Sequence, residues 1–137
     1  MLDLISAPTP VHRLVEWMLS EGFRLEREQL GGTNNQFARF CRSPLVVEVT
    51  ADRGDWSIGI GLDSMSATYH PDEWEAWHSY FDLAGDLSDL DHQVDFVTAR
   101  WLEVAANAGY SSDAEAQIRA IGVDFVRRRF GGWSAER

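Results

Sequence analysis

The chain has 137 residues, a length that suits one domain with a real hydrophobic core but not two ordinary domains. Its 45% hydrophobic content and six tryptophans argue against a disordered chain, and the single cysteine, Cys41, excludes an internal disulfide. The net charge of −10 disfavours nucleic acid and anionic membrane surfaces as partners, because both are polyanions. We expect one domain over residues 1–137, with loose ends at about 1–8 and 131–137.

The sequence contains no targeting or spanning segment that we can identify. No run approaches the roughly 18 apolar residues that cross a bilayer. The first five residues lack the basic leader and the long apolar region of a signal peptide. Together with the unpaired cysteine, these observations lead us to expect a cytoplasmic protein in a reducing compartment.

The first predicted element is a helix that begins after Thr9. Thr9 is a suitable N-cap, Pro10 fits the first helical position and Gly22 stands just past the end. Between them, apolar residues follow the spacing of a helix that is buried on one face: Val11, Leu14, Val15, Met18 and Leu19. The spacing predicts an amphipathic helix.

The apolar period changes to two between Phe23 and Leu62, which is typical of strands. We predict four strands, at 23–30, 36–42, 45–50 and 56–62. Because the connections between them are short, the strands should form an antiparallel meander. Gly59 and Gly61 share one face of the last strand, so a helix or an aromatic side chain should approach that face closely. A phosphate-binding loop is disfavoured because no P-loop lysine follows the glycines.

The second half of the chain is predicted to be helical. Asp72 and Glu75 resemble a capping pair of a short helix that runs to about Phe81. Ser88 and Asp91 could open a longer helix that Gly109 ends. One face of this longer helix is apolar: Leu90, Val94, Val97, Trp101, Val104 and Ala105.

A last helix is predicted to start at the capping box formed by Ser112 and Glu115. Its buried side would carry Ile118, Ile121 and Phe125. We therefore expect an α+β fold, in which a four-stranded antiparallel meander sheet has an N-terminal helix and about three C-terminal helices on one face.

The charge is distributed very unevenly along the chain. Residues 63–99 carry nine of the 22 acidic residues and no arginine, and the chain contains no lysine. Two interpretations remain open: the acids cap helices and solvate the surface, or they form a docking surface for an arginine- or lysine-rich partner. As the candidate docking surface we single out these acids: Asp72, Glu73, Glu75, Asp82, Asp86, Asp89 and Asp91.

Catalytic and metal chemistry find little support in the sequence. His78 and His92 could bind a metal with Asp82 or Asp91, but no recognised ligand spacing occurs, so we expect surface histidines beside carboxylates and no metal or cofactor. Cys41 fits a small buried strand residue at least as well as a nucleophile. Dense carboxylates without a recognisable pocket are weak support for acid–base catalysis.

The basic residues 127–129 would close a helix at its negative end. This role suits them better than binding nucleic acid, because the domain's overall field is negative. Their contact with the acidic segment, within the chain or in a dimer, is a further option.

The layout resembles small immunity proteins of bacterial polymorphic-toxin systems. The likeness lies in a compact acidic α+β chain, in the strand runs Leu45–Val49 and Trp56–Leu62, and in the tryptophan- and acid-rich stretch Pro71–Trp77. It carries no residue-level role. The resemblance implies a cytoplasmic antidote that binds a toxin domain and blocks its active site. A basic cleft, as in toxins that act on nucleic acids, would match an acidic inhibitor.

We therefore expect a non-enzymatic binding protein with a basic protein partner, as a monomer or a homodimer, and with neither nucleic acid nor membrane as partner. A secretion or client-binding chaperone is the alternative, and it predicts an exposed apolar groove and a symmetric dimer. An unrecognised enzyme would instead show a deep pocket with convergent polar groups.

Overall fold

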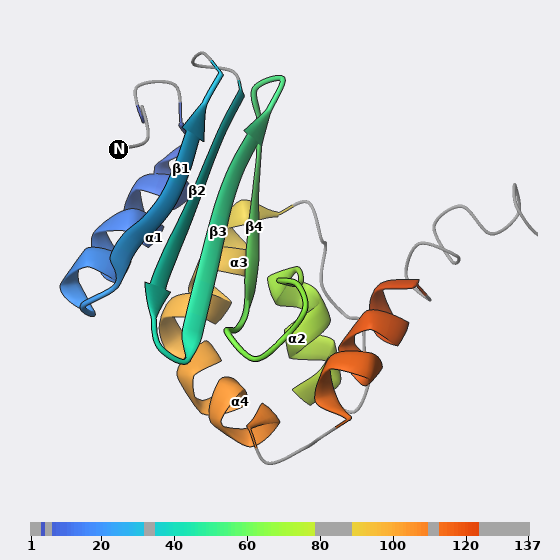
Figure 1. The fold of residues 1–137 in the computed structure, drawn as a ribbon. Coiled ribbons are helices and arrows are strands. Elements are labelled where there is room, and N and C mark those ends of the chain that lie inside the picture. The colour runs from blue at the N-terminus through green and yellow to red at the C-terminus, as the bar shows by residue number, and fades with distance from the viewer. Residues whose placement is uncertain (1–3, 5–6, 32–34, 79–88, 110–112, 124–137) are drawn as a thin grey trace, which may run out of the picture.

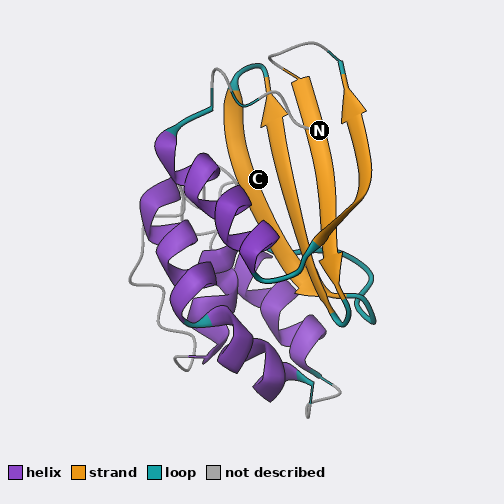
Figure 2. Ribbon diagram, turned by 90° about the vertical axis from the view of Figure 1, so that its left-hand side faces the viewer, coloured by secondary structure: helices purple, strands orange, loops and turns teal. Residues whose placement is uncertain are grey.

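The computed structural model describes residues 4, 7–31, 35–78, 89–109 and 113–123. One four-stranded antiparallel sheet carries the helices on one of its faces (Figures 1 and 2), which confirms the predicted α+β architecture. The labelled elements are α1 (Thr9–Ser20), β1 (Arg24–Leu30), β2 (Asn35–Arg42), β3 (Leu45–Asp52), β4 (Asp55–Leu62), α2 (Pro71–His78), α3 (Leu90–Ala99) and α4 (Trp101–Ala108). A further helical segment covers 114–123.

The structure describes only part of the two predicted loose ends. Leu4 and Ala7, which fall within the predicted loose stretch of about 1–8, pack against the hydrophobic core. The predicted loose end at 131–137 lies outside the described residues. No described helix combines the length and apolar character needed to cross a bilayer.

Helix α1 begins one residue earlier than predicted, because Pro8 rather than Thr9 occupies the N-cap position and provides no side-chain cap. Gly22 follows the helix with a φ of +84°, a conformation that favours glycine. Leu19 is 51% exposed, contrary to the prediction that it belongs to the buried stripe. At 3.6 residues per turn, Leu19 lies about 40° beyond Val15 around the helix axis, outside the arc that faces the core.

The sheet is a meander in the order β1-β2-β3-β4, as predicted. In β2, β3 and β4 alternation sends one side of the strand into the core, where cross-strand pairs such as Ala38–Val49 and Phe40–Val47 are buried. Strand β1 has no buried residue. The helices contribute these residues to the same core: Val11, Leu14, Met18, Trp74, Val94, Val97 and Trp101. This packing holds α2 and α3 at fixed positions over the sheet.

The segment that follows β4 pairs with the free edge of this strand, where Tyr69 forms an antiparallel bridge with Ile60, and it also lies close to the strand's glycine face. A Cβ atom at Gly59 would lie 2.5 Å from the Oγ1 atom of Thr68, and one at Gly61 would lie 3.1 Å from the carbonyl oxygen of Ala67. A close approach to the glycine face is thus present, but Ala67 and Thr68 of an irregular segment make it, not the predicted helix or aromatic side chain.

The helical half differs from prediction in how its helices begin and end. Helix α2 begins at Pro71, so Asp72 lies inside its first turn and is not a cap. Asp89, not Ser88, is the N-cap of α3 and accepts a hydrogen bond from the backbone N–H of His92. The single long helix predicted up to Gly109 is two helices, α3 and α4, which meet at Arg100.

The apolar pattern cannot reveal this break, because Val94, Val97, Trp101 and Val104 are buried on both sides of it. The capping box predicted for the last helix lies only partly within the described residues. Ser112 is not among them, and the Glu115 carboxylate instead accepts hydrogen bonds from Ser66 and Tyr69. Phe81 and Phe125, predicted on helix faces, lie outside the described residues.

Candidate functional site

Helix α2 is anchored to the sheet through Trp74, whose side chain is fully buried. Its indole N–H donates a hydrogen bond of 2.9 Å to the carbonyl oxygen of Ile60 on β4. Its ring meets the ring of Trp101 edge to face, with 6.4 Å between the centroids. These contacts fix the rotation of α2, and with it the direction in which its acidic residues point.

Asp72 and Glu75 lie one turn apart on α2 and face the first turn of α3. There the Nε2 atom of His92 lies 3.0 Å from an Asp72 oxygen and 3.3 Å from a Glu75 oxygen. Asp72 is only 4% exposed, whereas the side chains of Glu75 and His92 are 27% and 35% exposed. The structure therefore places Asp72 in the interior, where it cannot contact a docked protein directly.

Asp91 and Asp95, one turn apart on α3, both bond to the guanidinium of Arg13 on α1. The distances from Arg13 are 3.1 Å to Asp91 and 3.2 Å to Asp95. The two carboxylate side chains remain 71% and 68% exposed. Asp95 was not among the acids that the sequence singled out for docking, yet it is as accessible as Asp91.

The other residues predicted for docking do not share one location. Asp89 is exposed and caps α3. Glu73 is half-buried, and its carboxyl group lies 2.9–3.0 Å from the position that a Cβ atom at Gly122 would occupy. Asp82 and Asp86 lie outside the described residues. The structure thus brings Asp72, Glu75, Asp91 and Asp89 to neighbouring turns of α2 and α3, and it turns Glu73 toward the last helix.

Glu73 lines a hollow of about 390 Å³ together with Tyr69, Arg119, Gly122 and Val123. Burial raises the pKa of the Glu73 carboxyl to about 7, and the neighbouring charge of Asp72 acts in the same direction. A carboxyl with this pKa can exchange a proton near neutrality. No sequence pattern pointed to Glu73 as a titrating group, because its burial depends on the distant residue Gly122.

His78 and Cys41 make contacts other than those considered from sequence. The Nδ1 atom of His78 lies 3.1 Å from the Arg100 guanidinium. Burial raises the pKa of the Cys41 thiol, and the adjacent Glu26 carboxylate raises it further. A thiol with a raised pKa is rarely ionised near neutrality and is a weak nucleophile. The basic residues 127–129 lie outside the described residues.

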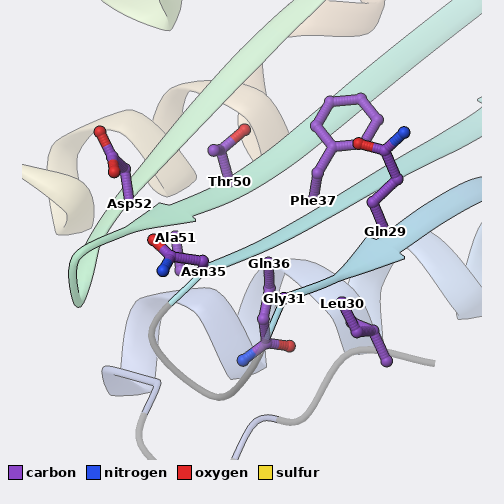
Figure 3. A pocket seen from close by; sticks show the side chains of 9 residues that line it. All are labelled: Gln29, Leu30, Gly31, Asn35, Gln36, Phe37, Thr50, Ala51 and Asp52. Carbon is purple, nitrogen blue, oxygen red and sulfur yellow. The ribbon is translucent and has the colours of Figure 1, made fainter.

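A hollow of about 490 Å³ lies at the end of the sheet that carries the β1–β2 and β3–β4 connections. Figure 3 shows that its lining side chains point to different sides of the strands, with Gln29 and Phe37 on one side and Gln36 on the other. Asp52 is the ionisable residue among the residues that line it. Side chains that diverge in this way do not form the convergent polar site of an enzyme pocket.

An apolar groove of about 540 Å³ lies where the β2–β3 turn and the end of β4 meet α4. Leu45, Leu62, Leu102 and Ala105 contribute to its lining, and Leu102 is 37% exposed. Arg42 and Asp63 lie at the same groove. This is the kind of surface that the chaperone alternative predicts.

The structure therefore offers an acidic surface on α2 and α3, a half-buried glutamate in a small hollow, and an apolar groove beside α4. Comparison with models of protein families, with curated proteins and with solved structures found no match to this chain.

Proposed function

We propose that this protein is a non-catalytic binding protein whose acidic surface on α2 and α3 docks a cation-rich protein. In this proposal it acts as an immunity protein does, by covering the basic site of a toxin domain. We define the acidic surface by its accessible carboxylates, Glu75, Asp89, Asp91 and Asp95.

The observation that carries the proposal is the exposure of two adjacent carboxylates that contact the same guanidinium. Asp91 and Asp95 remain more than two-thirds exposed while both bond to Arg13. A guanidinium carries one positive charge, so this group of three side chains is negative at neutral pH. Glu75 and Asp89, on neighbouring turns, add to the same field.

The contacts with Arg13 do not prevent docking. Ion pairs this exposed contribute about 0–1 kcal/mol to stability, because water screens them and ordering the side chains costs entropy. A partner's arginine or lysine can therefore replace Arg13 at little cost. A surface of this charge would mainly accelerate encounter and would exclude acidic partners.

The experiment compares two double variants that change the net charge equally. Asp91→Asn/Asp95→Asn removes the exposed carboxylates of α3, whereas Asp52→Asn/Asp55→Asn removes two exposed carboxylates from the β3–β4 hairpin. A protein captured by the wild type is identified, and its association rate is measured with each variant at about 0.05 and 0.5 M salt. We leave Asp89 unchanged because its carboxylate caps α3 and interacts with the positive end of the helix dipole, so removing its charge would also affect the helix.

We expect the α3 variant to associate roughly tenfold more slowly at low salt, the hairpin variant to associate as the wild type does, and high salt to remove the difference. A captured toxin should lose its activity when bound. Equal slowing by both variants, or a partner with an acidic surface, would show that the α2–α3 surface is not the docking site.

The apolar groove beside α4 favours one alternative, a client-binding chaperone. Its exposed Leu102 could hold an apolar segment of a client. Replacing Leu102 with Glu should then abolish capture, whereas the immunity proposal expects capture to continue. A symmetric dimer that releases an active, unfolded client would also favour the chaperone.

A further inference from the structure

We propose that Asp72, Glu75 and His92 bind one divalent transition-metal ion of the Zn²⁺ type between α2 and α3. This goes beyond the docking proposal, since it concerns a different ligand and rests on residues that lie partly beneath the acidic surface. The site joins two helices that are separated in the chain, and one of its ligands, Asp72, is almost fully buried.

The three donor atoms are close enough to share an ion. One ligand atom from each side chain can be chosen so that all lie within 4.8 Å of one another. The two measured separations from Nε2 of His92 are 3.0 Å and 3.3 Å. Ligands bound at about 2.0–2.2 Å around a tetrahedral or octahedral ion lie roughly 2.9–3.5 Å apart, so both separations fit adjacent ligands.

The orientation of the imidazole gives a second argument. The Nε2 atom is buried and makes no hydrogen bond, although two carboxylate oxygens are within 3.3 Å. The oxygens therefore lie to the sides of the direction in which an N–H would point. An ion bound about 2.1 Å along that direction places its other ligands at roughly 45° to it, which is this arrangement.

Charge favours a cation at this position. Two carboxylates held this close repel each other unless a positive charge lies between them. A divalent ion neutralises both carboxylates and uses the imidazole as a neutral donor.

The donor set indicates the class of metal. One imidazole nitrogen and two carboxylate oxygens suit Zn²⁺, Mn²⁺ or Co²⁺, whereas Ca²⁺ and Mg²⁺ prefer oxygen ligands throughout. Three protein ligands leave at least one position for water. Because the side chains of His92 and Glu75 are 35% and 27% exposed, an ion can enter from the solvent side while buried Asp72 closes the inner side.

The test uses the full chain without a tag, freed of metal with a chelator. Zn²⁺ is titrated by calorimetry near pH 7.5, and Co²⁺ is added to record its visible absorption. We compare the wild type with His92→Asn and with Glu75→Gln, which are partly exposed positions and leave the core intact. His78→Asn is the matched control, because this histidine lies on the same helix pair but contacts Arg100.

We expect one Zn²⁺ per chain, at least about 100-fold weaker binding in His92→Asn and Glu75→Gln, and unchanged binding in His78→Asn. Zn²⁺ should raise the Tm of the wild type and of the control, and not of the two ligand variants. Mg²⁺ at the same concentration should leave the Tm unchanged.

Absence of stoichiometric Zn²⁺ binding would overturn the proposal, and so would equal binding by the wild type and His92→Asn. Loss of binding in His78→Asn as well would locate the ion elsewhere. Asp91→Asn/Asp95→Asn keeps all three ligands, so it should bind Zn²⁺ fully even where it no longer docks a partner. The two proposals can therefore fail independently.

Discussion

The backbone N–H of Glu73 donates a hydrogen bond of 3.0 Å to the carbonyl oxygen of His70, where α2 begins. Burial shifts the pKa values of the Glu73 and His70 side chains in opposite directions. It raises the pKa of Glu73 to about 7, with the charge of Asp72 adding to the effect, and it lowers the pKa of His70 to about 4. In each case the folded protein favours the neutral form.

These two shifts predict opposing pH dependences of stability. Between pH 4.5 and about 7 the folded state holds a proton on Glu73 that the unfolded state has lost, so this residue lowers the free energy of unfolding as pH rises. Between pH 6.5 and about 4 the unfolded state protonates His70 and the folded state does not, so this residue lowers stability as pH falls.

We therefore expect Glu73→Gln to gain Tm relative to the wild type as pH rises from 4.5 to 7. His70→Gln should gain Tm relative to the wild type as pH falls from 6.5 to 4. Thermal unfolding followed by circular dichroism across this range measures both differences. Glu103→Gln, at an exposed position of α4, is the control for the general effect of the substitution. A change in Tm of the opposite sign would contradict the pKa shift given for that residue.

Trp74→Phe should destabilise the fold by about 2–4 kcal/mol. The change removes the donor to the buried carbonyl of Ile60 and leaves a cavity beside Trp101. Trp77→Phe is the matched control, because its indole N–H bonds the Gln117 side chain at 2.7 Å in a more exposed position. Urea unfolding should show a cost of less than about 1 kcal/mol for the control. Equal costs would mean that Trp74 does not anchor α2.

Gly59→Ala should cost about 1–3 kcal/mol, because the added Cβ would lie 2.5 Å from the Oγ1 atom of Thr68. That hydroxyl donates a hydrogen bond to the carboxylate of Glu48, so it has a reason to stay in place. Ser57→Ala, on the same face of β4 and exposed, should change stability by less than about 0.5 kcal/mol.

A double-mutant cycle with Thr68→Ala, measured by urea unfolding, tests the cause of the Gly59→Ala effect. If the contact is responsible, the alanine at position 59 should cost less when Thr68 is also alanine. The same cost in both backgrounds would point to backbone entropy at the glycine instead.

The local periodicity of the sequence predicted most of the elements, for a physical reason. Buried side chains recur every two residues in a strand and about every 3.6 residues in a helix. The spacing of apolar residues was therefore enough to predict that Val47, Ile58, Leu14 and Val97 are buried. Short connections then required neighbouring strands to pair, and the meander followed without knowledge of any distant contact.

Periodicity did not determine where helices break or which side chains meet between helices. The pattern ran through Arg100 unchanged because both α3 and α4 bury the same face, so the break was missed. The sequence paired His92 with nearby acids, whereas the structure places it against Asp72 and Glu75, 20 and 17 positions earlier.

What the sequence by itself determined was the α+β class, the order of the elements and the concentration of acidic residues in one segment. The tertiary structure decided which of those acids are exposed. Asp91 and Asp95 meet Arg13 because α1 packs beside α3, 78 and 82 positions away in the chain. Asp72 is buried because Trp74 fixes the rotation of α2. Such contacts depend on how the helices pack on the sheet and on one another, and the local pattern of residues does not determine this packing.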